Sequence, residues 1–238
     1  MLLLIYLLQV VSSLIMMGHT SILDLKSREV DLKIWLYYSP IILFIIYDIK
    51  HVYLPLYLYS LTTSELLLGL LYKFSMIGGA DVFASLLLSL ANAYIVPLFS
   101  SKLARLGMEP LLILLYTSLL ILFYGFYNFV RNIPYVKGYT FSQKLKLAFV
   151  GKRVKVRDFL NSRFLFPLTK IKEDGTVELR FNFDIEEDDK MWREYFRKLV
   201  EKGLIDENST IWVTWGIPVL PFMLMGYILS LLIGFPFI

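Results

Sequence analysis

The sequence predicts an all-α polytopic membrane protein with six transmembrane helices and a small α+β cytoplasmic domain inserted before the last helix. Hydrophobic residues make up 57% of the 238-residue chain and charged residues only 18%, with a mean hydropathy of +0.63. A soluble domain carries about a quarter charged residues. The apolar residues come in blocks near the roughly 20 residues that a helix needs to cross a bilayer. Charge gathers instead in the stretch 131–210, which holds 30 of the 44 charged residues.

Six apolar blocks are the candidate spans. They cover about residues 1–23, 34–47, 52–74, 81–99, 110–130 and 211–233. We therefore expect a membrane domain over 1–130, a soluble cytoplasmic α+β domain over 131–210, and a sixth transmembrane helix within 211–238 that packs with the membrane domain.

Basic residues set the expected orientation. The stretch after the fifth span carries eight basic residues before its first acidic residue, Asp158. Loops rich in Lys and Arg stay on the cytoplasmic side of a membrane. We expect the 131–210 domain on the cytoplasmic face of the cell membrane and both termini outside.

The inserted domain has local signals of its own. Thr140-Phe-Ser-Gln143 is a capping box and predicts a basic amphipathic helix to about residue 152, which would lie on the membrane surface. Asp174-Gly175 predicts a hairpin turn, and alternation over 177–183 predicts a half-buried strand. The acidic run 184–189 fits the N-terminus of a following helix, or a docking surface for a basic peptide.

Composition excludes several kinds of site. The chain has no cysteine, which excludes thiol catalysis, disulfides and cysteine-ligated metals. Its two histidines, His19 and His51, lie at or near opposite ends of the first two spans, which argues against a histidine metal site or a Ser/His/Asp triad. We expect no metal and no cofactor. Carboxylate, hydroxyl and lysine side chains remain for hydrolytic chemistry.

Two aspartates stand where apolar spans meet water, in the stretches Ser21–Val30 and Met76–Val82. Two candidate spans separate Asp24 from Asp81, and an even number of crossings returns the chain to the same face. An aspartyl hydrolase needs such a pair, one carboxylate to activate water and one carboxyl to donate a proton. Taken singly, each has a simpler explanation, Asp81 as a helix cap and Asp24 as a solvated loop residue.

The surroundings of the two acids differ. Asp24 is followed one helical turn later by Arg28, with Lys26 between them, and we expect these cations to favour its charged form. Asp81 lies among small and apolar neighbours, so we expect it to be the protonated partner more often.

Other residues have two interpretations each. Gly78 and Gly79 suit a place where backbone bends or approaches closely, and they also fit a plain turn. Glu65 lies in mid-span, where an ionisable residue is a functional candidate by default. The alternative, shared by Asn92, is a buried group hydrogen-bonded to neighbouring Ser or Thr. A functional Glu65 would favour an ion-coupled transporter or channel, and a further alternative is a non-catalytic membrane scaffold.

Two motifs resemble those of a known family. Asp24-Leu-Lys-Ser-Arg28-Glu-Val30, continued by Lys33-Ile-Trp35, is similar to an Asp-x-x-x-Arg-x-Val segment that follows the first span in that family. Gly78-Gly79-Ala80-Asp81 is similar to its Gly-x-Gly-Asp motif, with Ala80 in place of the second glycine. Pro218-Val-Leu-Pro221-Phe222, with Gly226-Tyr227, resembles its final span. The family is the archaeal preflagellin peptidases, within the type IV prepilin peptidases, which are membrane aspartyl proteases.

The resemblance implies removal of a short basic leader from preflagellin and related pilin-like precursors, at the cytoplasmic membrane boundary. It implies Asp24 and Asp81 as the catalytic pair, without metal or covalent intermediate, and peptidase activity without methyltransferase activity. Arg28, Lys26, Gly78, Gly79 and Ala80 would support that pair, and Glu29, Asp31 and Pro221 are candidates for substrate contact. The expected partners are a membrane-anchored precursor and the lipid bilayer, with no nucleic acid.

Overall fold

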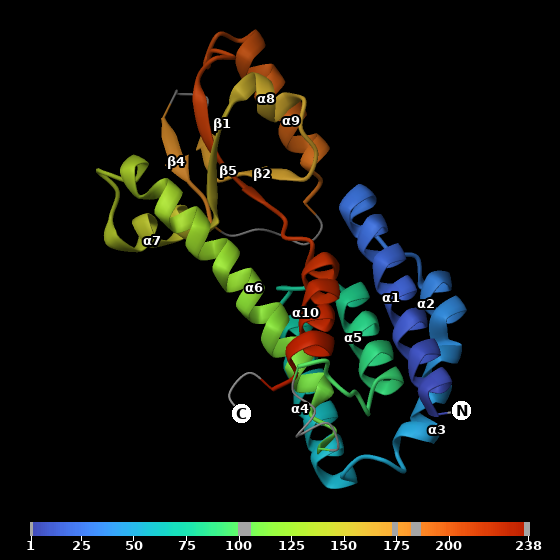
Figure 1. Ribbon diagram of the computed structural model, residues 1–238. Coiled ribbons are helices and arrows are strands. Elements are labelled where there is room, and N and C mark those ends of the chain that lie inside the picture. The colour runs from blue at the N-terminus through green and yellow to red at the C-terminus, as the bar shows by residue number, and fades with distance from the viewer. Residues whose placement is uncertain (1, 100–105, 173–175, 182–186, 236–238) are drawn as a thin grey trace. The chain divides into compact units, whose positions relative to one another are not determined.

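The computed structural model describes residues 2–99, 106–172, 176–181 and 187–235 (Figure 1). The chain forms two compact units, one of residues 1–121 with 218–238 and the other of residues 122–217. The described part of the first unit is helical. The second combines helices with two small antiparallel sheets.

The first unit is built from apolar helices. Its elements are α1 (Leu2–Ser27), α2 (Leu32–Tyr38), the 3₁₀ segment η1 (Ser39–Phe44), α3 (Ile45–Asp48), α4 (Leu54–Lys73), α5 (Gly79–Ala91), the first half of α6 (Glu109–Asn132) and α10 (Val219–Ile233). α1 packs against α10 and α5, and α2 also packs on α5. α1, α2, α5 and α10 therefore lie side by side (Figure 1).

Three of the described helices are long and apolar enough to cross a membrane: 3–27, 54–73 and 109–135. α5 and α10 are apolar but shorter, with 13 and 15 residues. A mostly helical membrane-type fold with a small β-containing domain is confirmed, whereas six full-length helical spans are not.

The structure departs from the predicted spans at three places. Residues 34–47 do not form one helix, because Pro40 lies in a 3₁₀ segment between α2 and α3 and has no N–H for a helical hydrogen bond. The block 81–99 is helical only to Ala91, and beyond it the Leu98 and Phe99 amides donate to carbonyls at the end of α10. The block 211–233 begins as a strand, and its helix starts only after Pro218.

A buried polar contact ties three elements of the first unit together. Asn92, just after α5, donates from Nδ2 to Ser13 Oγ on α1 at 2.8 Å. Tyr227 on α10 donates from its hydroxyl to Asn92 Oδ1 at 2.7 Å. All three side chains are fully buried, so each polar group needs such a partner. The hydrogen-bonded interpretation of Asn92 is confirmed.

The second unit has a three-stranded sheet in the order β1-β5-β2 (Gly151–Lys155, Thr210–Trp215 and Leu165–Pro167) and a hairpin of β3 (Thr169–Ile171) and β4 (Val177–Leu179). Its helical elements are the end of α6, η3 (Ile133–Tyr135), α7 (Phe141–Val150), α8 (Val156–Leu160) and α9 (Asp189–Glu201). Phe159 of α8 and Phe196 of α9 pack with Val213 of β5 in a buried apolar core.

Local predictions for this unit are confirmed in part. The capping box at Thr140 starts α7, but the helix ends at Val150 because the next five residues pair with β5 as strand β1. β3 and β4 pair as a hairpin, although its turn, 173–175, lies outside the described residues. β4 ends at Leu179 and Val177 is exposed rather than half-buried. Residues 182–183 of the predicted strand lie outside the described residues.

The helix expected after the acidic run is confirmed as α9. The face of α9 packs into the core of the second unit through Trp192, Tyr195, Phe196, Leu199 and Val200. Asp188 caps its N-terminus by accepting from the Lys190 amide at 2.9 Å, as expected for the end of the acidic run. Residues 184–186 of that run lie outside the described part of the chain.

Candidate active site

Asp24 lies in the last turn of α1, beside Arg28. Arg28 Nη1 is 3.9 Å from Asp24 Oδ1, and both side chains are largely buried. Arg28 follows the last helical residue with a φ of +61°, and its amide donates to the Asp24 carbonyl at 3.0 Å. This left-handed conformation ends the helix and turns the arginine back toward the aspartate. The predicted pairing of Asp24 with Arg28 is therefore present.

The other oxygen of Asp24 meets a different helix. Asp24 Oδ2 accepts from the Leu220 amide, in the first turn of α10, at 3.3 Å. Pro218, which precedes α10, offers no side-chain cap, and Pro221 has no N–H, so the aspartate satisfies a helix-end donor across the bundle. The sequence gives no signal for this contact beyond the two prolines. This contact places Pro221, a predicted substrate-contact residue, directly after the residue whose amide binds Asp24.

Asp81 lies in the first turn of α5 and is only 7% exposed. Its Oδ2 accepts from the Gly78 amide at 2.9 Å. Gly78 is the residue that precedes the helix, so Asp81 caps the helix from its third position rather than from the cap position itself. The capping explanation is therefore real but accounts for one oxygen. Among the described residues the other oxygen has no hydrogen-bond partner.

The space around Gly78 and Gly79 would allow a larger residue at either position. A Cβ added at Gly78 would lie 3.6 Å from Asp81 Oδ2, and one added at Gly79 would lie 3.6 Å from the Tyr72 ring, both ordinary contacts. Gly78 has a φ of −84°, which any residue adopts. Ala80 packs against the apolar core of the first unit. A close approach of other backbone to Gly78 or Gly79 thus remains a prediction.

The two aspartates come from neighbouring helix ends, because α1 packs on α5. α10, whose Leu220 amide binds Asp24, also packs against α5. α2 lies alongside, with the Trp35 ring stacked on Phe83 of α5 at 6.4 Å between centroids. Two buried donors in these helices, Ser21 Oγ and Trp35 Nε1, have no hydrogen-bond partner in the described part of the chain. Groups of this kind are available to a bound ligand.

Three other predicted residues are not drawn into contact with either aspartate. Lys26 and Glu29 are exposed, and the described structure pairs neither with an ion of opposite charge. Asp31 caps α2 by accepting from the Lys33 amide at 2.8 Å. Its position therefore has a structural explanation that does not involve a substrate.

Three further acids lie within the helical first unit: Glu65, Glu109 and the fully buried Asp48, which accepts from Gln9 Nε2 at 2.8 Å and from the Tyr94 amide at 3.0 Å. Glu65 is half-buried and accepts from Ser85 Oγ at 2.8 Å and from Ser89 Oγ at 3.4 Å, which confirms the hydrogen bonding but not the full burial expected of it. Glu109, which sequence reasoning did not single out, is 4% exposed and accepts from Ser230 Oγ. The only sequence feature that could have identified Glu109 is its position, directly before the apolar block 110–130.

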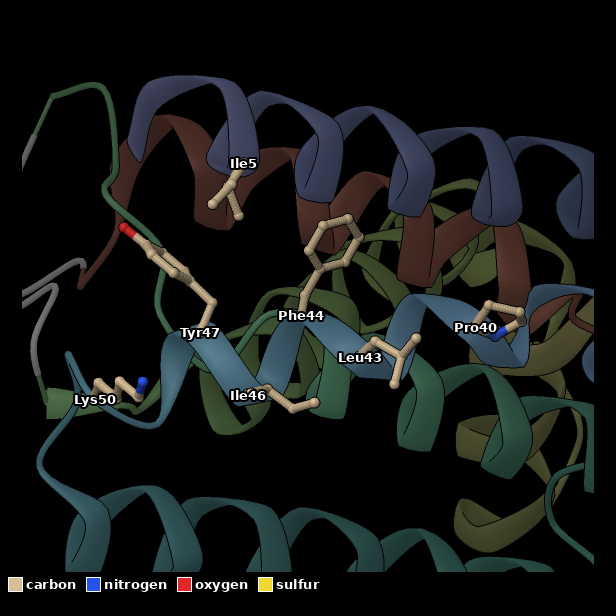
Figure 2. A pocket seen from close by; sticks show the side chains of 7 residues that line it. All are labelled: Ile5, Pro40, Leu43, Phe44, Ile46, Tyr47 and Lys50. Carbon is tan, nitrogen blue, oxygen red and sulfur yellow. The ribbon is translucent and has the colours of Figure 1, made fainter. Parts of the chain in front are cut away.

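An apolar groove of about 570 Å³ lies elsewhere in the first unit (Figure 2). Ile5 of α1 faces Phe44 and Tyr47 across it, and Lys50 lies at one end. Neither aspartate lines this groove. The described residues contain no group of three or more His, Cys, Asp or Glu that could hold a metal ion.

Comparison with known families matches both parts of the chain. Residues 11–126 match the type IV leader peptidase family, and residues 143–235 match the archaeal peptidase A24 C-terminus, type II. No curated protein matches the sequence. The first match contains both aspartates, and the second contains most of the inserted domain and α10. The chain belongs to the type IV leader peptidase family and is an aspartic endopeptidase that cleaves leader peptides from prepilin- or preflagellin-type precursors.

Proposed function

We propose that Asp24 and Asp81 are the catalytic pair of this peptidase. One carboxylate takes a proton from a water molecule, and the resulting hydroxide attacks the carbonyl carbon of the scissile peptide bond. The other carboxyl donates its proton to the carbonyl oxygen, forming a tetrahedral intermediate. Proton transfer to the amide nitrogen then lets the carbon–nitrogen bond break, releasing an amine and a carboxylic acid.

The observation that carries this proposal is the pair of largely buried carboxyls at neighbouring helix ends. Asp24 has Arg28 beside it, a cation that favours a negative charge. Asp81 is buried and has one oxygen without a hydrogen-bond partner among the described residues, which leaves that oxygen for water or substrate. These surroundings favour Asp24 as the base and Asp81 as the acid of a coupled pair.

The finer substrate assignment also belongs to this proposal. We assign the active site to the cytoplasmic membrane boundary, where the substrate's own apolar helix holds its leader junction at the depth of the two aspartates. The basic leader remains in water. Glu29 and Asp31 are exposed acids close in sequence to Asp24 and are of the right charge to attract it. The Ser21 hydroxyl and the Trp35 N–H are donors for the extended substrate backbone.

Purified protein in detergent, mixed with a preflagellin precursor, tests the pair. Asp24→Asn and Asp81→Asn should each lower leader cleavage by at least about 10²-fold, because general acid–base groups contribute that much. Glu65→Gln is the matched control, since Gln preserves an acceptor for Ser85 and Ser89 and should cleave normally. Normal cleavage by either aspartate variant would remove the pair from the mechanism. Loss of cleavage in Glu65→Gln would reopen a role for mid-span acids.

A further inference from the structure

The second unit contains a cavity of about 490 Å³ lined by residues of the last turns of α6, η3, strand β1 and the start of β5. Its lining includes three basic side chains and three tyrosines: Arg131, Lys152, Arg153, Tyr124, Tyr127 and Tyr135. No acidic side chain is among the described residues that line it. A cavity with this lining favours an anion.

The three cations are not neutralised within the described structure. No ion pair joins Arg131, Lys152 or Arg153 to a carboxylate there. The Arg153 guanidinium lies over the Tyr135 ring at 4.8 Å and near the Trp212 ring at 5.9 Å, which orients its donors without satisfying them. A guanidinium group held in this way can donate two parallel hydrogen bonds to two oxygens of one phosphate.

The backbone that carries these side chains is held in place, although Arg131, Lys152 and Arg153 are themselves exposed. Asn132 is buried and donates from Nδ2 to the Gly151 carbonyl at 2.6 Å and to the Ala148 carbonyl at 3.1 Å. These bonds fix the end of α6 to the junction of α7 and β1. Gly151 is itself crowded, because an added Cβ would lie 2.4 Å from the Leu147 carbonyl oxygen. The positions of Arg131, on α6, and of β1 are therefore set by the fold.

The neighbouring surface indicates what kind of anion binds. α6 belongs to a helical stretch, 109–135, that is long and apolar enough to cross a membrane. Beside the cavity, α6 exposes Phe123, Phe126 and Val130. Tyrosine and basic residues at the end of such a stretch are typical of the membrane–water boundary. An occupant that fits both surfaces has a phosphate and apolar chains.

We propose that this cavity binds the phosphate headgroup of an anionic membrane lipid, whose chains lie along α6. A basic leader peptide does not fit, because it would meet three like charges. The inference relies on α6 crossing the membrane and does not use the aspartates. Its failure therefore leaves the proposed catalytic pair untouched, and failure of that pair leaves this site untouched.

Native mass spectrometry of the full chain in detergent tests the proposal, with phosphatidylglycerol and phosphatidylcholine as probes. Wild-type protein should retain phosphatidylglycerol preferentially. Arg131→Gln with Lys152→Gln should weaken that binding roughly thirty-fold, because each basic residue near an anionic lipid contributes a factor of about five. Arg197→Gln with Lys198→Gln removes the same charge from the exposed face of α9 and should bind like wild type.

Several outcomes would overturn the lipid site. Equal retention of the two lipids would do so, as would equal loss in both double variants. Displacement of phosphatidylglycerol by inorganic phosphate at comparable concentration would assign the cavity to free phosphate instead. Should Arg131→Gln with Lys152→Gln fail to fold, Arg153→Gln is the second variant, and unchanged phosphatidylglycerol binding there would count against the proposal.

Discussion

Both aspartates do structural work at helix ends in addition to their proposed chemistry. Asp24 accepts from the first turn of α10, and Asp81 accepts from the residue that precedes α5. In each contact the donor is a backbone amide, which is held by the helix and therefore fixes the position of one carboxyl oxygen. A helix N-terminus also favours negative charge. The capping and catalytic interpretations of these residues are therefore compatible, because the capping hydrogen bond holds each carboxyl in position for the proposed chemistry.

Two substitutions of Arg28 can separate the effect of its charge on activity from the effect of its backbone conformation on stability. It adopts a left-handed conformation that costs a non-glycine residue about 1 kcal/mol. Arg28→Gly and Arg28→Ala both remove the cation, so both should shift the acidic side of the pH–activity profile to higher pH. Arg28→Gly should in addition be about 1 kcal/mol more stable than Arg28→Ala. Cleavage assays across pH and unfolding in mixed micelles measure the two effects, and an unmoved profile in both variants would contradict a role for the Arg28 charge.

At the scale of elements, α10 and α6 approach closely where Gly226 faces Thr117. A Cβ added at Gly226 would lie 2.5 Å from Thr117 Oγ1 and 2.9 Å from the Thr117 backbone nitrogen. Small residues at such crossings let helices pack through backbone contact. Because α10 supplies the amide that binds Asp24, this crossing also positions the candidate site.

Gly226→Ala should therefore destabilise the protein by about 1–3 kcal/mol, as overpacking does. The matched control is Gly18→Ala on α1, where no atom lies within 4 Å of an added Cβ. That change should be stabilising by roughly 0.5–1 kcal/mol, because alanine is the better helix former. Equilibrium unfolding in mixed micelles compares them, and equal effects of the two substitutions would show that the crossing is not tightly packed.

In the second unit, Asp189 links α9 to the loop before β2. It accepts from the Phe164 amide at 2.6 Å and from Arg193 Nη1 at 2.5 Å, and Phe164 has a φ of +59°. Burial of this carboxyl opposes ionisation, but the Arg193 and Phe164 hydrogen bonds and the Arg193 charge together lower the pKa of Asp189 below its ordinary value. Its ionised form is therefore the one that stabilises the fold.

The pH dependence of stability should follow from that direction. A carboxyl with a lowered folded pKa stabilises fully above its unfolded pKa, about 3.9, and loses that contribution as pH falls through the folded value. Asp189→Asn should thus melt below wild type at neutral pH, and the difference in Tm should shrink as the pH falls below about 3.9. Thermal unfolding of the two proteins across pH measures this. A difference that is constant with pH would exclude the charge as its source.

At the scale of the whole molecule, topology is open to direct measurement because the chain has no cysteine. In the proposed orientation, Glu29→Cys, Met76→Cys and Lys155→Cys all face the cytoplasm, and Lys50→Cys faces outward. A membrane-impermeant maleimide should label Lys50→Cys in intact cells and the other three only after permeabilisation. Labelling of positions 29 and 76 from opposite sides would separate the two aspartates and exclude a shared active site.

Much of this protein follows from its sequence, for reasons that are local. The capping box at Thr140 and the helix after the acidic run depend on residues a few positions apart, and the structure confirms them. Of the six apolar blocks, three form helices long enough to cross a membrane in the described part of the chain. The motifs around Asp24 and Asp81 were also visible, and the family matches agree with them. Hydrogen bonding of Glu65 and Asn92 was expected in kind, although their partners were not identified in advance.

Only the tertiary structure decided where several apolar blocks stop being helical and what their ends contact. Residues 211–215 belong to an apolar block that was predicted to be a span, yet pairing with β1 and β2 makes them a strand. The bond from Leu220 to Asp24 joins residues at opposite ends of the chain, and the approach of Gly226 to Thr117 depends on how two helices cross. Hydropathy reports how strongly a segment avoids water. It does not report which distant segment will form hydrogen bonds with its backbone, and it is such a long-range bond that places α10 against Asp24.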